Sequence, residues 1–328
     1  MDRREFIAAI GFGLINVSPM IWAQQRAKVV RIGCILAGSR AAADAEGVTG
    51  ALIAGLRSLG WIEGENLMIE YRSAENQNEL LDKLARELVA LKVDLIVTGG
   101  VNVVIAAKNA TNSTPIVMVN AADPVKFGLV ASLARPGANV TGSALPPIDW
   151  GKWLELAGES VSGASRIAVI ANPDNRVYAD YVVQNEAAAK RLGLRLQMLR
   201  VARAEQLDEA FVAMKREKAA AVVVGPDALY LSRMQEISDR ALASRLPLIG
   251  PNRRAAERGA LIGYGLDIRS AWRGAAKYID RILKGARPAD LPVEQPTKFE
   301  LIINLKTAKR LGLTIPQPLL LRADEVIE

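Results

Sequence analysis

The chain has no histidine and only one cysteine among its 328 residues. Without histidine it lacks the commonest metal ligand and the commonest general base, so a zinc hydrolase and a Ser-His-Asp enzyme both lose their central residue. Cys34 has no partner for a disulfide or for a CxxC metal or redox site. Because it lies in the apolar run 29–36, we expect a buried, unreactive thiol. These absences predict no catalytic residue and no metal site.

Charge of one sign is not concentrated along the chain. Lys and Arg number 42 and Asp and Glu 35, which gives a net charge of +7. The basic residues are interleaved with acids and do not form the stripe that phosphate-backbone binding needs. Aromatic residues are scarce at 5%, while apolar residues make up half of the chain. This composition is typical of a globular protein and predicts no nucleic-acid partner.

An apolar run at residues 7–21 follows the twin arginine Arg3-Arg4. At about 15 residues it is shorter than the roughly 20 that a membrane-spanning helix needs, and Ala23 is a small residue suited to cleavage. We therefore predict an export signal over residues 1–25, cleaved after Ala23, and a periplasmic mature protein. The motif resembles twin-arginine signals except at Asp2, so export by the Tat or the Sec route stays open.

The rest of the chain alternates short β-branched runs with amphipathic stretches, which predicts an α/β fold with parallel sheets and crossover helices. Its length exceeds that of one typical domain, so we expect two lobes. For the first lobe the pattern predicts strands at 29–36, 67–71, 93–97, 115–119 and 140–145, with helices at 43–59, 79–91 and 103–110. For the second it predicts strands at 166–171, 194–201, 220–224, 247–249 and 261–264, with helices at 150–160, 178–192, 205–217 and 231–243.

The C-terminal part departs from this rhythm. A predicted helix at 268–283 is followed by a proline-rich stretch at 287–292 and by a predicted strand at 299–303. A helix and a strand that come after both units can return to the two lobes in turn, which gives several hinge segments. We expect one lobe over 28–145 and about 267–288, and the other over 146–266 and about 289–328.

The turns that follow the predicted strands hold the candidate binding residues. In parallel sheets ligands bind beyond the carboxyl ends of the strands, where helix N-termini offer free backbone donors. Six polar or glycine-bearing turns are expected to face one crevice. The candidate ligand-binding residues in them are Ser39, Gly99, Gly100, Asn102, Asp123, Asn172, Gly225, Pro226, Tyr264 and Asp267.

Some of these residues also have a purely structural interpretation. Ser39, Asn172 and Asp267, like Asp227, are suited to cap the helices that follow them. Gly99-Gly100 lacks the spacing of a phosphate loop or a dinucleotide fingerprint, so no nucleotide cofactor is predicted. Asp123 with Asp267 would suit acid/base chemistry, but no nucleophile or metal motif accompanies them, and cation binding is the preferred interpretation.

Among the aromatic residues near these turns, Tyr264 is the best candidate to cover a planar ligand, because it lies between two glycines at a strand end. For Tyr178 and Tyr230 we expect packing against their own helices.

Several segments together resemble the ABC transporter substrate-binding family that includes binders of tryptophan and other aromatic amino acids. They are RIG at 31–33, GLRSLGWIEGEN at 55–66, IEYR at 69–72, DPVKFGLVASLARPG at 123–137, NVTG at 139–142, NP at 172–173, ILKGARPADLPVEQPT at 282–297 and RADEVI at 322–327. The resemblance covers nearly the whole mature chain. It implies a type I periplasmic binding protein fold, with two Rossmann-like lobes, three hinge crossings and a ligand between the lobes.

By this resemblance the chain is an importer's extracytoplasmic solute-binding subunit, a monomer without enzymatic activity that docks on an ABC permease. We expect Ser39 and the 99–102 amides to hold a carboxylate, Asp123 an ammonium group and Tyr264 a flat apolar body. RGALIGYG at 258–265 and Asn120-Ala-Ala depart from the family's usual residues, so a relative's ligand is not carried over. A sensory module that passes its closed form to a receptor, and a small α/β isomerase or hydrolase, are the alternatives.

Overall fold

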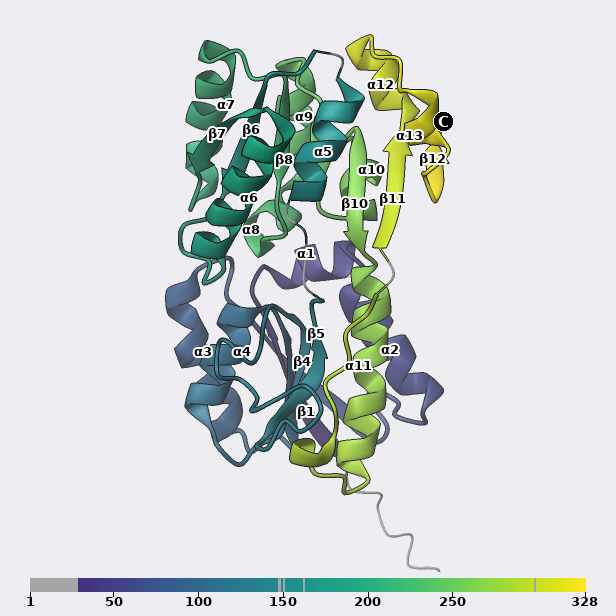
Figure 1. The fold of residues 1–328 in the computed structure, drawn as a ribbon. Helices are drawn as coiled ribbons and strands as arrows, with labels where there is room; N and C mark the ends of the chain where they lie inside the picture. The colour runs from purple at the N-terminus through teal and green to yellow at the C-terminus, as the bar shows by residue number, and fades with distance from the viewer. Residues whose placement is uncertain (1–28, 147–148, 150, 162, 298) are drawn as a thin grey trace, which may run out of the picture.

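The computed structural model describes residues 29–146, 149, 151–161, 163–297 and 299–328, so the predicted export signal lies outside the described residues. Within this range the chain forms two sheets, one in each half of the molecule (Figure 1). No helix among the described residues combines the length and the apolar character that a membrane crossing requires.

The first sheet has five strands in the order β2-β1-β3-β4-β5, and its paired strands are all parallel. Buried apolar residues on both faces explain this, because parallel sheets are covered by helices on both sides. One face packs against α2 and α11, the other against α3 and α4. The bounds are β1 Val30–Leu36, β2 Leu67–Ser73, β3 Leu95–Gly99, β4 Ile116–Ala121, β5 Val140–Ala144, α1 Arg40–Ala45, α2 Val48–Ser58, η1 Asn78–Leu80, α3 Leu81–Ala90, α4 Val101–Ala110 and α11 Ile268–Leu283.

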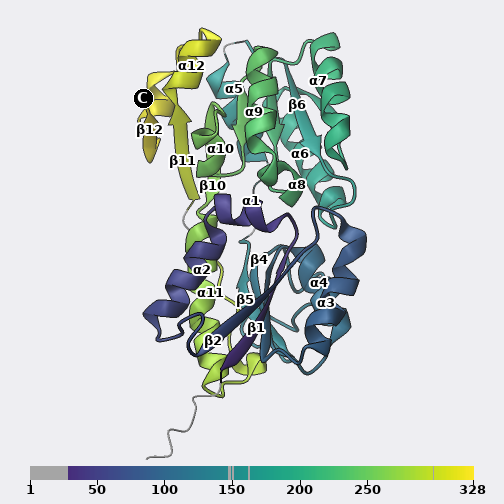
Figure 2. The same cartoon turned by 180° about the vertical axis from the view of Figure 1, so that it is seen from behind.

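The second sheet has seven strands in the order β12-β11-β10-β9-β8-β6-β7. Helices α5 and α6 cover one face, and α7 to α10 cover the other. Figure 2 shows this second group from behind. The bounds are β6 Arg166–Ala171, β7 Arg195–Arg200, β8 Ala221–Val224, β9 Leu248–Gly250, β10 Ile262–Leu266, β11 Phe299–Asn304, β12 Glu325–Ile327, α5 Gly151–Ser160, α6 Tyr178–Leu192, η2 Ala204–Gln206, α7 Leu207–Arg216, α8 Ala228–Ser232, α9 Met234–Ala243, α10 Arg253–Glu257, η3 Pro288–Asp290, α12 Leu305–Leu311 and α13 Gln317–Leu320.

The chain passes between the two halves three times, which confirms the expected crossings. The passages lie between β5 and α5, between β10 and α11, and between η3 and β11. After α11, Leu291 and Val293 still pack in the cores of the first sheet, and the amide of Ala144 donates to the carbonyl of Glu294 at 2.9 Å. We call the half around the first sheet, including α11, lobe 1, and the half around the second sheet lobe 2.

Two predicted helices are interrupted. The expected helix at 43–59 is two helices, α1 and α2, because Gly47 adopts φ 74° between them. The expected helix at 231–243 is divided into α8 and α9 at Arg233, and α8 begins earlier because Asp227 caps it. Both predictions relied on apolar periodicity, which continues across a one-residue break and does not reveal it.

The second sheet is not wholly parallel. Strand β11 runs antiparallel to β10 and pairs in parallel with the short β12. The prediction of parallel sheets is wrong at this edge, since β11 reaches the sheet from lobe 1 and not from a crossover helix. The elements α10, α12, α13 and β12 are short, and no periodic pattern had predicted them.

Candidate functional site

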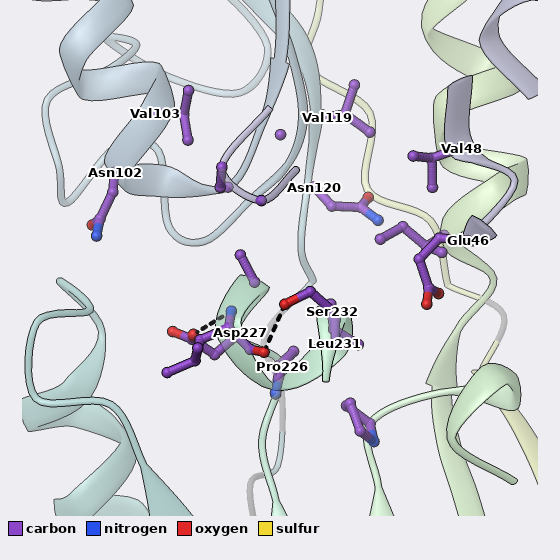
Figure 3. A pocket seen from close by; sticks show the side chains of 18 of the residues that line it. Glu46, Val48, Asn102, Val103, Val119, Asn120, Pro226, Asp227, Leu231 and Ser232 are labelled. Atoms are coloured by element: carbon purple, nitrogen blue, oxygen red, sulfur yellow. Dashed lines mark hydrogen bonds between the residues drawn. The ribbon is translucent and has the colours of Figure 1, made fainter. Parts of the chain in front are cut away.

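A cavity of about 300 Å³ lies between the two lobes, at the carboxyl ends of their parallel strands. This volume is at the lower end of the range of small-molecule pockets, roughly 300–1,000 Å³. Figure 3 shows wall residues of lobe 1, including Asn102, Val119 and Asn120, facing Pro226, Asp227 and Ser232 of lobe 2. The wall is mainly apolar, with polar groups at the strand-end turns.

Six of the predicted binding residues line this cavity. They are Ser39, Gly99, Gly100, Asn102, Asn172 and Pro226. Gly99 is the last residue of β3, and each of the others follows a strand within a few residues, so the strand end carries them to the interlobe face. The sequence argument from strand ends therefore located this wall.

The N-terminus of α4 presents backbone donors to the cavity. Gly100 precedes the helix with φ 82°, a conformation that favours glycine, and no side chain caps the first turn. The first amides of a helix have no acceptor within it and carry a partial positive charge. Ser39 lies across a neighbouring turn, where its Oγ accepts from the amide of Ala42 at 3.0 Å and its hydroxyl hydrogen can still be donated. The first amides of α4 and the Ser39 hydroxyl together are suited to bind an anionic or hydrogen-bond-accepting group of a ligand.

Asn102 lines the cavity and also forms hydrogen bonds between the two lobes. Its Nδ2 donates to the carbonyl of Asp174 at 3.2 Å, and its Oδ1 accepts from the amide of Arg176 at 3.3 Å. Lys126 and Asp180 form an ion pair along the same rim. The lobes are therefore in direct polar contact on the α4 side of the cavity.

The opposite rim is closed by a second polar bridge. Glu46, between α1 and α2, pairs with Arg258 at 3.1 Å and with Arg254 at 3.8 Å, both in lobe 2. Arg254 also donates to the carbonyl of Ala45. Burial raises the pKa of Glu46, and the two guanidinium groups oppose that shift. We call this set of contacts the Glu46 bridge.

Asp227 is the carboxylate at the lobe 2 wall. It begins α8, where its Oδ1 accepts from the amide of Leu229 at 3.0 Å. Nδ2 of Asn175 donates to its Oδ2 at 2.8 Å, and Nδ2 of Asn172 lies 3.3 Å from both oxygens. The side chain is partly accessible because it borders the cavity, yet burial raises its pKa.

An aromatic wall borders the cavity where the hinge segments enter. Trp153, Trp272 and Phe299 line it. Tyr264, the predicted aromatic contact, does not: its ring stacks on Phe299 at 5.5 Å between centroids and meets Trp153 edge-on at 6.0 Å. The ring therefore supports the wall from within lobe 2. The sequence argument had placed Tyr264 at a strand end but could not give the direction of its side chain.

Three other predicted residues lie outside the cavity wall. Asp123 accepts from the amide of Lys126 at 3.0 Å within its own turn. Asp267 caps α11 through the amide of Arg269 at 3.0 Å and the hydroxyl of Ser270 at 2.7 Å. Gly225 lies behind Pro226, where an added Cβ would be 2.9 Å from Oη of Tyr181.

Sequence reasoning missed several polar wall residues, namely Glu46, Asn76, Asn120, Asn175, Asp227, Ser232 and Asn252. The sequence analysis interpreted Asp227 only as a helix cap. A residue that caps a helix directly after a strand also lies at the strand-end face, where ligands bind. Asn76 and Asn120 have positive φ values of 62° and 50°. Such values are uncommon outside glycine but favour asparagine, so an Asn in a strand-end turn was the available signal.

Tyr178 and Tyr230 were expected to pack against their own helices, and they pack with the cores of lobe 2. Cys34 is buried as expected. Tyr230 is buried, and its hydroxyl donates to the carbonyl of Val201 at 2.7 Å. Tyr178 packs against the lobe 2 core. Cys34 has no exposed surface, and burial raises its pKa to about 12. Within the described ranges no cluster of three or more His, Cys, Asp or Glu side chains is placed to bind a metal.

Comparisons with known proteins give one consistent answer. Residues 35–327 match the model of the ABC transporter substrate binding protein family. A tyrosine-binding protein of Clostridioides difficile is 29% identical over 261 residues, which cover 80% of this chain and 75% of that protein. A conserved domain protein of Vibrio cholerae superposes with a TM-score of 0.83 at 27% identity, over 91% of this chain and all of that one.

Two further solved structures differ in state. The ABC domain of Streptococcus pneumonia in complex with L-Trp gives a TM-score of 0.81 at 25% identity. The ligand-free, open structure of a substrate binding protein with adhesive properties from Clostridium difficile gives 0.64 at 26% identity. Both alignments cover 91% of this chain and 99% of the other. At nearly equal identity and coverage, this chain superposes better on the L-Trp complex than on the ligand-free, open structure.

Proposed function

The chain belongs to the ABC transporter substrate-binding protein family, and from that premise we propose that it is an importer's extracytoplasmic subunit. In this role it binds a small amino or organic acid between its lobes and catalyses no reaction. The cavity carries the proposal, because both lobes contribute polar groups to its wall while they contact each other around it.

Binding would work by stabilising the closed arrangement. A solute that touches both lobes binds the closed form better than the open one, and this difference in affinity sets the shift in population. The three interlobe passages allow the lobes to move as rigid bodies about a hinge. Segments near these passages, at Leu145, Leu266, Ile268 and Phe299, also line the cavity. Closure and solute contact therefore involve the same part of the chain.

Within the cavity we assign the acceptor end of the solute to Ser39 and to the first amides of α4, including that of Asn102. The amide of Gly100 is not among them, because it donates to the carbonyl of Val119 at 3.3 Å. Asn172 and Pro226 would contact the solute from lobe 2, and the faces of Trp272 and Phe299 would cover its apolar part. Asp123, Gly225, Tyr264 and Asp267 would act indirectly, through the turns and rings they position. In particular, Tyr264 would hold the ring of Phe299.

The partners follow from the family. We propose that residues 1–25 direct export, that the mature protein is a periplasmic monomer, and that its closed form docks on a membrane permease. The tyrosine-binding protein and the L-Trp complex among its relatives support an amino acid as the first solute to test.

Isothermal titration calorimetry tests this function. The purified protein, freed of bound solute by partial unfolding and refolding, is titrated with a panel of amino and organic acids that includes L-tyrosine and L-tryptophan. We expect saturable binding of at least one member with a stoichiometry of one, together with a rise in melting temperature. Turnover of a bound compound, or no binding by any member, would contradict the proposal.

A further inference from the structure

We propose that the solute carries a protonated amine and that Asp227 is the residue that holds it. This inference rests on the proposed function and decides a question that the function leaves open. A carboxylate-binding subsite at α4 would serve an amino acid and an amine-free organic acid equally well, whereas a carboxylate on the opposite wall distinguishes them.

The hydrogen bonds around Asp227 fix the orientation of this side chain and favour its charged form, against the effect of burial. Oδ1 of Asn172 accepts from the amide of Asp174 at 3.0 Å, and Oδ1 of Asn175 accepts from the amide of Val177 at 3.2 Å. With their oxygens engaged in this way, both asparagines must present their NH₂ groups to Asp227. These two donors and the amide of Leu229 converge on the carboxylate. Three donors favour the ionised form over the neutral acid.

That negative charge has no cationic partner in the protein. Among the described residues no lysine or arginine forms an ion pair with Asp227, and the nearby charge that acts on it is that of Asp174, a second carboxylate. An uncompensated charge in a largely buried site is costly. A cation entering the cavity would remove that cost, and here the solute is the source of the cation.

Two other wall residues, Asn76 and Asn120, have side-chain acceptors without a donor among the described residues. Ser232 donates its hydroxyl to the carbonyl of Leu229 at 2.8 Å, so it must accept from Nδ2 of Asn76 at 3.3 Å. This bond fixes the orientation of the Asn76 side-chain amide. Oδ1 of Asn76 and Oδ1 of Asn120 each lack a hydrogen-bond donor among the described residues. Asn76 is thereby tied to α8, the helix that Asp227 begins. A primary ammonium group brings three N–H donors to a wall that holds these two acceptors.

The test uses matched pairs of ligands that differ only in the amine. L-tryptophan is compared with indole-3-propionate, and L-tyrosine with 3-(4-hydroxyphenyl)propionate, by calorimetry on the wild type. Putrescine tests an amine without a carboxylate, and myo-inositol tests hydroxyl donors alone. We expect the amine-bearing member of a pair to bind at least tenfold more tightly than its deaminated counterpart.

The matched variants are Asp227→Asn and Asp208→Asn. Asparagine is a good helix N-cap, so Asp227→Asn keeps α8 while it removes the charge. Asp208 is an exposed acid at the start of α7, paired with Arg240 and away from the cavity, and its replacement removes one negative charge from the same lobe. Asp227→Asn should weaken binding of the amine-bearing ligand by about 10- to 100-fold, whereas Asp208→Asn should leave it unchanged.

The outcomes separate this inference from the function. If a deaminated acid or the polyol binds the wild type as tightly as any amine, and Asp227→Asn leaves that affinity intact, the amine proposal is overturned while the binding function stands. Loss of binding in both variants would indicate a general charge effect and would also overturn it. Absence of binding by every ligand would overturn both proposals.

Discussion

At the scale of single residues, the site depends on the carboxylate of Asp227, whose charge is disfavoured by burial and favoured by three hydrogen bonds. Burial raises the pKa of Asp227, the neighbouring Asp174 adds to that shift, and the bonds from Asn172, Asn175 and the amide of Leu229 oppose it. Such a group responds to ligand charge, because a bound cation favours its ionised form and lowers its pKa.

The first prediction concerns pH. As pH falls through the raised pKa of Asp227, the carboxyl takes up a proton and loses the charge that attracts the amine. Affinity for an amine-bearing solute should therefore decrease on acidification from neutral pH, with proton release on binding near that pKa. Titrations in buffers of different ionisation enthalpy measure both effects. Asp227→Asn should show little pH dependence over this interval, and an equally steep profile in that variant would assign the titration to another group.

The second prediction concerns Cys34. With no exposed surface and a pKa raised to about 12, the thiol should not react with an aromatic disulfide reagent such as DTNB in the folded protein. Adding denaturant should release one equivalent. Rapid reaction under native conditions would show that β1 becomes accessible without global unfolding.

At the scale of elements, packing between α2 and α11 joins segments more than 200 residues apart in the chain. Gly55 makes this close approach, because an added Cβ would lie 2.7 Å from the carbonyl oxygen of Arg273 and 2.9 Å from the Cβ of Ala276. Gly50 lies in the same helix, where an added Cβ meets nothing within 4 Å. The two glycines differ only in what faces them.

This difference gives the third prediction. Gly50→Ala should raise the free energy of unfolding by about 0.5–1 kcal/mol, since alanine favours the helix. Gly55→Ala should lower it by about 1–3 kcal/mol, because overpacking against α11 outweighs that gain. Chemical denaturation with both variants measures the contrast. Equal stabilisation by both would mean that α2 and α11 separate at little cost.

How well each helix and strand could be predicted from the sequence depends on how many residues carry its pattern. Long buried strands and amphipathic helices such as α6 were predicted from composition and periodicity alone, because those patterns extend over many residues. The break at Gly47 and the cap at Asp227 each depend on one residue, so the pattern missed them. In the site, strand ends located Ser39, Gly100 and Asn172. The direction of the Tyr264 ring depends on Phe299, a residue that joins the sheet from another part of the chain.

At the scale of the whole molecule, polar contacts close both rims of the cavity. Asn102 bonds lobe 2 on one side, and the Glu46 bridge spans the other. The side chain of Glu46 is 11% exposed, while those of its arginine partners are 19% and 25% exposed. Removing one partner of a pair at this depth costs more than breaking a surface ion pair, because it leaves a partly buried charge without a counter-charge. The pair also requires contact between the lobes.

The fourth prediction tests this bridge. Glu46→Gln leaves two arginines without their interlobe counter-charge and should disfavour closure by about 1–3 kcal/mol. In the solute-free protein, small-angle X-ray scattering should show a larger radius of gyration, and bound solute should dissociate faster. The control is Glu257→Gln, because Glu257 pairs with Arg254 inside one helix and does not span the lobes. An expanded control would indicate a local effect on α10.

The three passages of the chain between the halves have a mechanical consequence. A proteolytic nick between β5 and α5 would give two polypeptides without a covalent link, but α11 of the second would remain packed against α2 of the first. Cleavage there should therefore not release a separate fragment under native conditions. Three neighbouring passages also constrain how the halves can turn relative to one another. We therefore expect any opening to be a hinge motion that brings the same two surfaces together again on closure.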